Sequence, residues 1–173
     1  MSLSSHLVQL RGRVDEHFSR ALDRTPEAFA CRPGCDQCCH ARFSVFEVEA
    51  APLRTALMAL EERDPSLRER VRIQGRDPDL PHCALLVDGQ CAVYEQRPLI
   101  CRSHGLPIAV PDEGEPEGSL RVDHCPLNFT EGQSIPRPSI LVLDAVNRPL
   151  AVLAELTHPG APRVGLCDLA GEK

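Results

Sequence analysis

Four cysteines crowded into nine positions constrain the fold of this chain more than any other feature of its sequence. Residues 31–39 read Cys-Arg-Pro-Gly-Cys-Asp-Gln-Cys-Cys, and the chain of 173 residues contains nine cysteines in all. Pro33 and Gly34 lie among them and favour a loop. We therefore expect a loop over residues 31–40 whose conformation is set by a ligand that the thiols bind.

Metal binding is the expected role of these cysteines. Thiolates are soft ligands that select zinc, copper(I) or iron–sulfur clusters, and closely spaced thiolates can converge on one centre. In a reducing compartment, nine cysteines rarely form structural disulfides. The odd total fits eight ligands plus Cys167, which lies in a C-terminal apolar run and is expected to be buried or free. The candidate metal ligands are Cys31, Cys35, Cys38, Cys39, Cys83, Cys91, Cys101 and Cys125.

The number of metal centres stays open at this point. Successive side chains of an extended backbone point in opposite directions, so adjacent Cys38 and Cys39 reach one ion only through a distorted turn, which favours two centres. Eight thiolates can form two four-cysteine sites, one iron–sulfur cluster plus one zinc site, or a single cluster with spare cysteines. The spacing matches neither the bacterial ferredoxin run nor a common zinc ribbon closely, so zinc and iron are equal candidates.

Basic side chains near the cysteines are expected to offset the thiolate charge. Two divalent ions on eight thiolates leave a net charge of about −4, and hydrogen bonds to sulfur compensate part of it. The arginines close to cysteines in the sequence are Arg32, Arg42, Arg97, Arg102 and Arg121. For Arg32 and Arg121 we favour a solvated surface position. The histidines near cysteines, which we expect to surround the metal or face solvent rather than bind it, are His40, His82, His104 and His124.

Composition argues against several other classes of function. Acidic residues outnumber basic ones by 25 to 19, for a net charge of −6, so we expect no nucleic-acid partner. No segment approaches 18 uninterrupted apolar residues and the N-terminus lacks a secretory apolar region, so we expect a cytoplasmic protein that does not cross a membrane. GxGxxG, P-loop, GxSxG and HExxH motifs are absent from the sequence, so nucleotide binding and standard hydrolase chemistry have no support.

The hydrophobic pattern predicts a small, mainly helical α+β domain that spans residues 1–173. Apolar residues at helical spacing predict a first helix over residues 3–23. A second helix is predicted to follow a capping box at residues 44–47 and to end at about Arg63, and a third is predicted from Asp64-Pro65 to about Gln74. An apolar run at residues 140–156 also has helical spacing. Pro149 lies within it, so we expect a kink or break around Asn147.

Two hairpins are predicted between the helices. Asp88-Gly89, between two apolar runs, is a strong signal for a β-hairpin, and Cys83 and Cys91 would lie on its opposite arms. The acidic, Pro- and Gly-rich residues 111–119 are expected to form an exposed loop that joins strands at 108–110 and 120–122.

The cysteine pattern resembles a known family. Four parts of the sequence carry the resemblance, namely the run at residues 31–39, Cys83, the segment Cys91-Ala-Val-Tyr-Glu-Gln-Arg-Pro-Leu-Ile-Cys-Arg102, and Cys125. In their order and spacing they are similar to the bacterial CxxCxxCC family, often called YkgJ-like. The similarity extends over residues 28–155, which we take as the cysteine-cluster metal-binding region. It implies chelation of zinc or iron, and some members carry iron–sulfur or oxidoreductase labels. Flagellin lysine methylases contain related clusters, but we find no S-adenosylmethionine site here.

The resemblance also implies roles for residues beside the metal. Pro98 would fix a turn that brings Cys101 toward Cys91, and Arg97 and Arg102 would counter the thiolate charge. Tyr94 is expected beside the cofactor or in the core.

The expected function is that of a metal-binding protein in which eight cysteines hold zinc ions, iron or an iron–sulfur cluster such as 4Fe-4S. Bound metal would contribute much of the folding energy. The alternatives are an iron–sulfur redox or group-transfer enzyme, a trafficking protein for zinc, iron or copper, and a structural zinc module. No protein partner is predicted.

Overall fold

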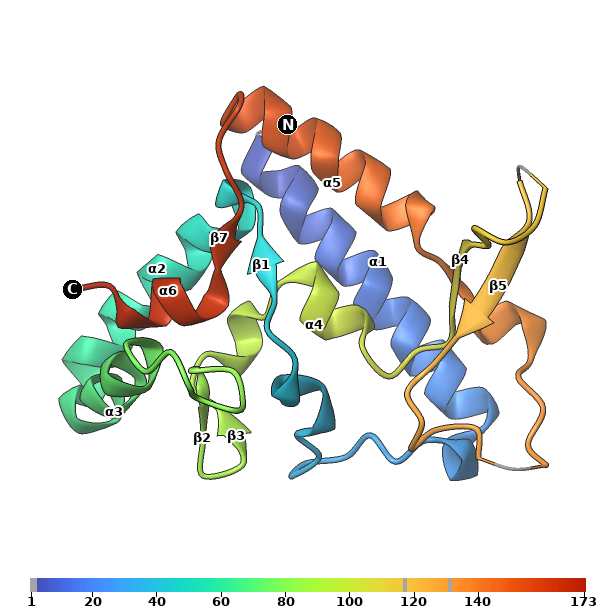
Figure 1. Ribbon diagram of the computed structural model, residues 1–173, viewed down its shortest axis with the longest axis horizontal. Coiled ribbons are helices and arrows are strands. Elements are labelled where there is room, and N and C mark those ends of the chain that lie inside the picture. Colours follow the sequence, from blue (N-terminus) through green and yellow to red (C-terminus); the bar gives the residue numbers. More distant parts are fainter. Residues whose placement is uncertain (1–2, 117, 131) are drawn as a thin grey trace. The chain divides into compact units, whose positions relative to one another are not determined.

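The structure, a computed structural model, describes residues 3–116, 118–130 and 132–173 (Figure 1). It is 51% helical and its strands are short, so the small, mainly helical α+β domain expected from the sequence is confirmed. Within it, the chain forms two compact units. Unit 1 consists of Met1–Pro33 and Arg102–Val152, and unit 2 of Gly34–Cys101 and Leu153–Lys173.

Unit 1 combines a long helix with a three-stranded sheet. Helix α1 (Leu3–Arg24) confirms the helix predicted over residues 3–23, and a short 3-10 helix, η1 (Pro26–Ala28), follows it. The face of α1 that is buried carries Leu7, Leu10, Val14 and Ala21. Burial of one such leucine or valine stabilises a fold by about 1.5–3 kcal/mol. This apolar face therefore stabilises the packing of α1.

The sheet of unit 1 has the strand order β5-β4-β6. Strands β4 (Ile108–Pro111) and β5 (Leu120–Asp123) are antiparallel, which confirms the two strands predicted there, and β6 (Leu141–Val142) is parallel to β4. In the loop expected over 111–119, most described residues are exposed, and Glu117 lies outside the described residues.

The helix expected from residue 140 begins later and does not break. Residues 137–142 form the 3-10 helix η4 (Arg137–Ser139) and strand β6, and helix α5 (Asp144–Thr157) follows. Asn147 lies inside α5, where its N–H donates to the Leu143 carbonyl at 2.9 Å. The break predicted there is wrong, since α5 continues through Pro149 to Thr157. The proline removes one backbone hydrogen bond, and burial of Val146, Leu150 and Leu153 on the same helix favours its continuation.

Unit 2 contains three helices and two small antiparallel pairs of strands. Its helices are α2 (Glu47–Arg63), α3 (Pro65–Gly75) and α6 (Leu166–Gly171), while α4 (Leu99–Ser103) ends just beyond it. Strands β2 (Leu86–Val87) and β3 (Gln90–Cys91) form the hairpin predicted at Asp88-Gly89. Strands β1 (Ser44–Val45) and β7 (Val164–Gly165) form the other pair.

The start of α2 differs from the prediction, whereas the start of α3 agrees with it. The capping box at residues 44–47 is wrong: Phe46 precedes α2 and makes no side-chain cap. Ser44 instead pairs with Gly165 in the β1–β7 pair, a long-range contact that local spacing does not reveal. Helix α3 starts after Asp64 as predicted, and the structure adds that the Asp64 carboxylate caps it by accepting a hydrogen bond of 2.9 Å from the Leu67 N–H.

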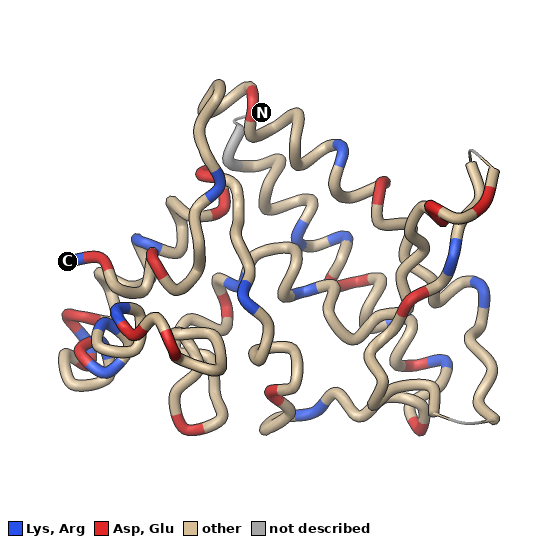
Figure 2. Tube along the Cα trace, viewed as in Figure 1, with Lys and Arg blue, Asp and Glu red and all other residues tan. Residues whose placement is uncertain are grey.

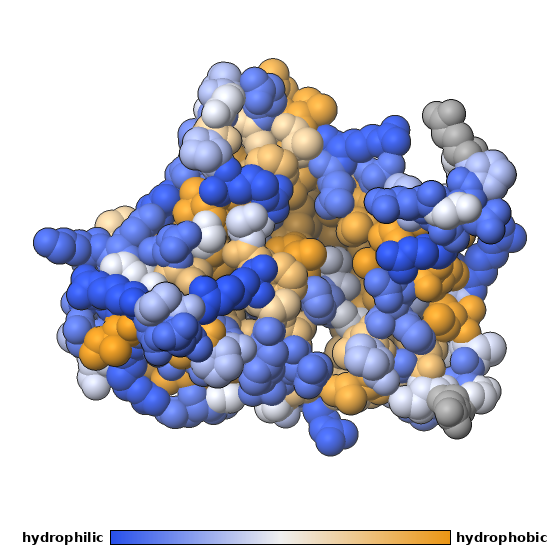
Figure 3. All heavy atoms as spheres, viewed as in Figure 1, coloured by the Kyte–Doolittle hydropathy of each residue, from blue (hydrophilic) through white to orange (hydrophobic). Residues whose placement is uncertain are grey.

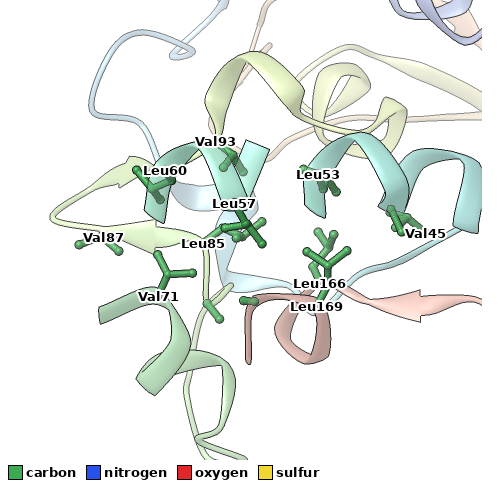
Figure 4. Packing of buried hydrophobic residues seen from close by; sticks show 13 residues of the cluster. Val45, Leu53, Leu57, Leu60, Val71, Leu85, Val87, Val93, Leu166 and Leu169 are labelled. Atoms are coloured by element: carbon green, nitrogen blue, oxygen red, sulfur yellow. The ribbon is translucent and has the colours of Figure 1, made fainter. Parts of the chain in front are cut away.

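The core of unit 2 lies between its helices and the hairpin. Side chains from α2, among them Leu53, Leu57 and Leu60, point toward Val71 of α3 and Leu169 of α6 (Figure 4). Four half-buried cysteines pack against this core, namely Cys83, Cys91, Cys101 and Cys167. The apolar core therefore supports most of the thiols that come from outside the 31–39 loop.

Charge and apolar surface are distributed without one dominant patch on the views shown. Lys and Arg are scattered along the chain among Asp and Glu (Figure 2), and the face in Figure 3 mixes hydrophilic and hydrophobic residues. In the described ranges, no helix combines the length and the apolar character that a membrane span requires.

The hairpin turn generates a prediction. Asp88 and Gly89 have φ angles of 52° and 75°, as a two-residue type I′ turn requires. Gly89→Ala places a side chain in this left-handed conformation and should lower the free energy of unfolding by about 1–2 kcal/mol. Gly12→Ala in α1, where the added methyl meets nothing within 4 Å, should raise it by about 0.5–1 kcal/mol. Urea denaturation measures both, and a Gly89→Ala protein as stable as wild type would contradict this account of the turn.

Candidate metal centre

Four thiols from separate segments of unit 2 interact with one another electrostatically. Cys38 lies in the 3-10 helix η2 (Gln37–His40), Cys83 precedes β2, Cys91 ends β3, and Cys101 lies in α4. The other three thiols raise the pKa of Cys101 electrostatically, and Cys38 and Cys91 raise the pKa of Cys83 in the same way. We call these four residues the unit 2 thiol set.

Backbone hydrogen bonds bring the first three members of the set together. The Cys83 N–H donates to the Cys39 carbonyl at 2.6 Å, which fastens the start of the hairpin to η2. The Cys83 carbonyl accepts from the Leu86 N–H at 2.9 Å, and Leu86 is the register partner of Cys91. Cys91 thus lies on one arm of the hairpin, whereas Cys83 lies in the turn three residues before the other arm, so the predicted position of Cys83 on an arm is wrong.

A buried carboxylate positions the fourth member. Glu49 of α2 is only 2% exposed, and its Oε1 accepts a hydrogen bond of 2.8 Å from the Leu99 N–H at the start of α4. Pro98 precedes this helix, and the Cys101 N–H donates to the Pro98 carbonyl at 3.0 Å. Sequence reasoning did not single out Glu49, because a glutamate in the first turn of a helix is an ordinary surface residue in most proteins.

The pKa values of the thiol set are raised, for three members chiefly by burial and for Cys38 chiefly by a hydrogen bond. Desolvation is the main reason that the pKa of Cys83 is raised to about 11 and that of Cys101 to about 12, and it also raises the pKa of Cys91. The pKa of Cys38 is raised chiefly by its hydrogen bond with Cys39 and then by burial. Thiols are the donors that zinc and iron prefer, once metal binding has displaced their protons.

Arg97 is the basic residue that acts on the set. Its positive charge lowers the pKa of Cys38, Cys91 and Cys101, against the larger effect of burial or hydrogen bonding. The guanidinium lies over the Tyr94 ring, 3.6 Å from its centroid, and Nε donates to the Tyr94 carbonyl at 3.2 Å. Tyr94 is 55% exposed, so it supports Arg97 from the surface and is not a core residue.

The remaining arginines have other partners. Arg102 belongs to unit 1, where it pairs with Asp15 of α1 at 2.5 Å. Arg42 donates to the carbonyl of Leu80 at 2.9 Å, between the η2 loop and the hairpin. Arg32 and Arg121 are exposed, the position favoured for them from the sequence, and Arg121 lies 3.8 Å from Asp123.

Cys31 and Cys125 lie in unit 1, around Asn128. This side chain is only 1% exposed. Its Oδ1 accepts from the Ala30 N–H at 2.8 Å, and its Nδ2 donates to the Gly105 carbonyl at 2.7 Å and to Cys31 Sγ at 3.4 Å. Its own N–H donates to the Cys125 carbonyl at 2.9 Å. No motif flagged Asn128, since its partners are far apart in the chain.

Close packing around Cys31 also explains a glycine. Gly105 has a φ of +97°, and a Cβ added to it would lie 2.6 Å from Cys31 Sγ. Only glycine combines this left-handed backbone with room for the sulfur. Cys31 is therefore held on two sides, by the Asn128 amide and by the Gly105 backbone.

The other sequence-predicted residues lie at the edges of these groups. Cys35 is exposed, and Cys39 lies beside Cys38 in η2. Because η2 spans Gln37–His40, the continuous loop predicted over residues 31–40 is wrong at its end. The rings of His40 and His82 are 6.1 Å apart, and His82 Nδ1 lies 3.0 Å from the Cys83 carbonyl.

In unit 1, the ring of His124 stacks on Phe129 at 6.1 Å, and His104 is half-buried beside Gly105. None of the nine cysteines, all of which the structure describes, forms a disulfide. Within the described ranges, no three His, Cys, Asp or Glu side chains are arranged to bind one metal ion.

The hydrogen bonds of Asn128 generate a second prediction. Asn128→Ala leaves the Ala30 N–H and the Gly105 carbonyl without their partner, so the free energy of unfolding should fall by about 1–3 kcal/mol. The matched control is Asn147→Ala on the exposed side of α5, which should change it by less than about 0.5 kcal/mol. Equal effects of the two substitutions in urea denaturation would show that the Asn128 contacts are unimportant.

The raised thiol pKa values generate a third prediction, for protein stripped of metal and kept reduced. At about pH 8, a thiol of pKa 11 is ionised in roughly one molecule in a thousand. Iodoacetamide should therefore label exposed Cys35 at least about tenfold faster than Cys83 and Cys101. The labelling rate of the two buried thiols should rise with pH until it passes their pKa values.

Peptide mapping by mass spectrometry follows each cysteine in this experiment, and urea-unfolded protein is the control in which all should react alike. Rapid labelling of Cys83 and Cys101 in the folded protein at pH 8 would rule out the buried, protonated set.

Comparison with known proteins places these cysteines in a family. Residues 30–126, more than half of the chain, match the model of the CxxCxxCC family, described as "Putative zinc- or iron-chelating domain". Searches of curated proteins and of solved structures found no match. All eight predicted ligands lie within the matched residues, and Cys167 lies outside them. The chain belongs to the CxxCxxCC family of zinc- or iron-chelating domains.

Proposed function

We propose that this protein chelates zinc or iron and that the unit 2 thiol set is its principal centre. The observation that carries the proposal is the match of residues 30–126 to a family described as a zinc- or iron-chelating domain, since these residues contain Cys38, Cys83, Cys91 and Cys101. The structure adds that Cys83, Cys91 and Cys101, which come from different segments of the chain, are half-buried and pack against one apolar core. Thiols are the donors that zinc and iron–sulfur clusters prefer.

Four thiolates suit either metal. They complete the tetrahedral shell of a structural zinc ion, and they are also the usual ligands of a 4Fe-4S cluster. Arg97 supplies positive charge beside the set, which offsets part of the charge that four thiolates leave after binding. When bound, the metal would cross-link η2, the hairpin and α4, and so stabilise unit 2.

The other four cysteines of the family pattern are proposed as further ligands, which gives the eight expected from the sequence. Cys39 lies directly beside Cys38, and Cys35 lies on the exposed loop before it. Cys31 is oriented by Asn128, whose N–H also bonds the Cys125 carbonyl. An amide hydrogen bond to sulfur favours the thiolate that a metal requires.

The test is metal analysis of anaerobically purified protein, with its visible spectrum, for wild type and two single variants. Wild type should contain zinc or iron, and absorption in the visible would identify an iron–sulfur cluster. Cys91→Ser should remove the metal of the unit 2 set, with at least about a tenfold loss of affinity. Gln90→Ala, at the exposed neighbouring position in β3, should retain it.

Two results would overturn the proposal. One is wild-type protein that contains neither zinc nor iron after anaerobic isolation. The other is a Cys91→Ser protein with the metal content and affinity of Gln90→Ala, since loss of one of four thiolates must weaken a centre that uses all four.

A further inference from the structure

Strand β5 forms one edge of the unit 1 sheet. The order β5-β4-β6 places β4 on one side of it, and among the described residues no strand pairs with its other side. All four of its residues, Leu120–Asp123, are exposed. An open edge of this kind presents a row of N–H and C=O groups with which another strand can pair. The open side of β5 is therefore a place where the sheet can be extended.

The hydrogen bonds of β4 show which peptide groups of β5 face the open side. The Ala109 carbonyl accepts from the Leu143 N–H at 3.2 Å, on the β6 side of β4. The N–H and C=O of one residue in a strand point to the same side, so Ala109 makes no backbone bond to its register partner, Val122. Val122 consequently turns its own N–H and C=O away from β4. By the same alternation, the peptide groups of Leu120 also face the open side.

The side chains of β5 form an apolar face and a charged face. Leu120 and Val122 lie two residues apart and share one face, where they are 56% and 44% exposed. Val142 of β6, also exposed, lies on this face too, since Ala109 is the register partner of both valines. The opposite face carries the exposed side chains of Arg121 and Asp123. An exposed apolar strip thus lies back to back with one positive and one negative charge.

These charges are complementary to those of a second copy of the same strand. If two β5 strands pair antiparallel about a two-fold axis at Val122, the Arg121 of each copy lies directly opposite the Asp123 of the other. Opposite charges in such cross-strand positions stabilise a pair of strands, and like charges destabilise it. A register centred on Arg121 would instead place the two arginines opposite each other. Charge therefore selects the register centred on Val122.

The acidic loop before β5 does not oppose this pairing. The loop over residues 111–119 precedes Leu120, so in two antiparallel strands the loops leave from opposite ends. Their carboxylates are thereby kept apart. The pairing brings together only the apolar faces and the two Arg121–Asp123 contacts.

We propose that β5 is a self-association surface on which a second copy of this chain pairs antiparallel about Val122. The two Val122 residues exchange N–H···O=C bonds, and ion pairs between Arg121 and Asp123 flank them on one face. The two three-stranded sheets join into one, with a continuous apolar strip formed by Leu120, Val122 and Val142 of both copies. The surface belongs to unit 1 and does not depend on the metal centre proposed in unit 2.

The size of the surface sets the strength of the association. Four residues from each copy bury less than the roughly 1,200 Å² at which stable interfaces begin. We therefore expect a reversible dimer with a dissociation constant of roughly 10 μM to 1 mM. Its formation should depend on protein concentration.

The first test is sedimentation velocity of the full chain with a thiol reductant, from about 5 μM to about 2 mM. The reductant prevents dimers linked by disulfides between the nine cysteines. The mass of wild type should rise from 19.0 kDa toward twice that value. Arg121→Glu should weaken the dimer at least about tenfold, because it replaces two attractive contacts by two repulsive ones. Arg137→Glu makes the same charge change at an exposed position of η4 and should leave the dimer unchanged.

Two further variants test the register. Arg121→Glu combined with Asp123→Lys reverses both charges and should recover at least about threefold of the lost affinity, which a purely structural role of Arg121 would not allow. Val122→Pro removes an N–H that faces the open side and no bond to β4, so the sheet should persist while the dimer is lost. Circular dichroism of each variant, compared with wild type, checks the fold.

The outcomes are decisive in both directions. A wild-type chain that stays monomeric up to about 2 mM would overturn the proposal and leave the open edge to a different partner. A dimer that is equally strong in Arg121→Glu, Val122→Pro and Arg137→Glu would also overturn it, because it would have to form on another surface. Metal analysis of the same samples tests the unit 2 centre separately, so failure of one proposal is distinguishable from failure of the other.

Discussion

Thiols held uncharged against the apolar core of unit 2 are the basis of both the fold and the site. In the metal-free chain, burial raises the pKa of Cys83 and Cys101, so these side chains pack as small hydrophobic groups. The same burial makes them costly to ionise alone and favourable to ionise together around a cation. One set of residues can therefore serve as core packing without metal and as a ligand shell with it.

The contacts that assemble this set are long-range and mostly involve the backbone. Cys83 bonds the Cys39 carbonyl, and buried Glu49 holds the start of the helix that carries Cys101. The β1–β7 pair attaches the C-terminal helix, and with it Cys167. Carbonyls, amides and one carboxylate therefore do much of the positioning of these segments. Asn128 has the corresponding role for Cys31 in unit 1.

Local chemistry made several elements predictable. The Asp88-Gly89 turn and the start of α3 at Asp64-Pro65 depend only on neighbouring residues, and both are present as predicted. Ser44 fitted a capping pattern equally well, yet it lies in a strand because a segment more than a hundred residues away pairs with it. Pro149 suggested a break, but α5 continues through it and buries Val146, Leu150 and Leu153. Local rules failed where tertiary packing or a distant partner decided the conformation.

The amino-acid sequence determined the donor chemistry: nine soft sulfur atoms, a family pattern that spans eight of them, and the turns at which several occur. Tertiary structure alone decided which part of the molecule holds each of them. It placed Cys38, Cys83, Cys91 and Cys101 in unit 2 and Cys31 and Cys125 in unit 1, and it packed Cys83, Cys91, Cys101 and Cys167 against the unit 2 core. The physical reason is that ligand type is a property of each side chain, whereas proximity depends on packing and hydrogen bonds between segments that no local spacing relates.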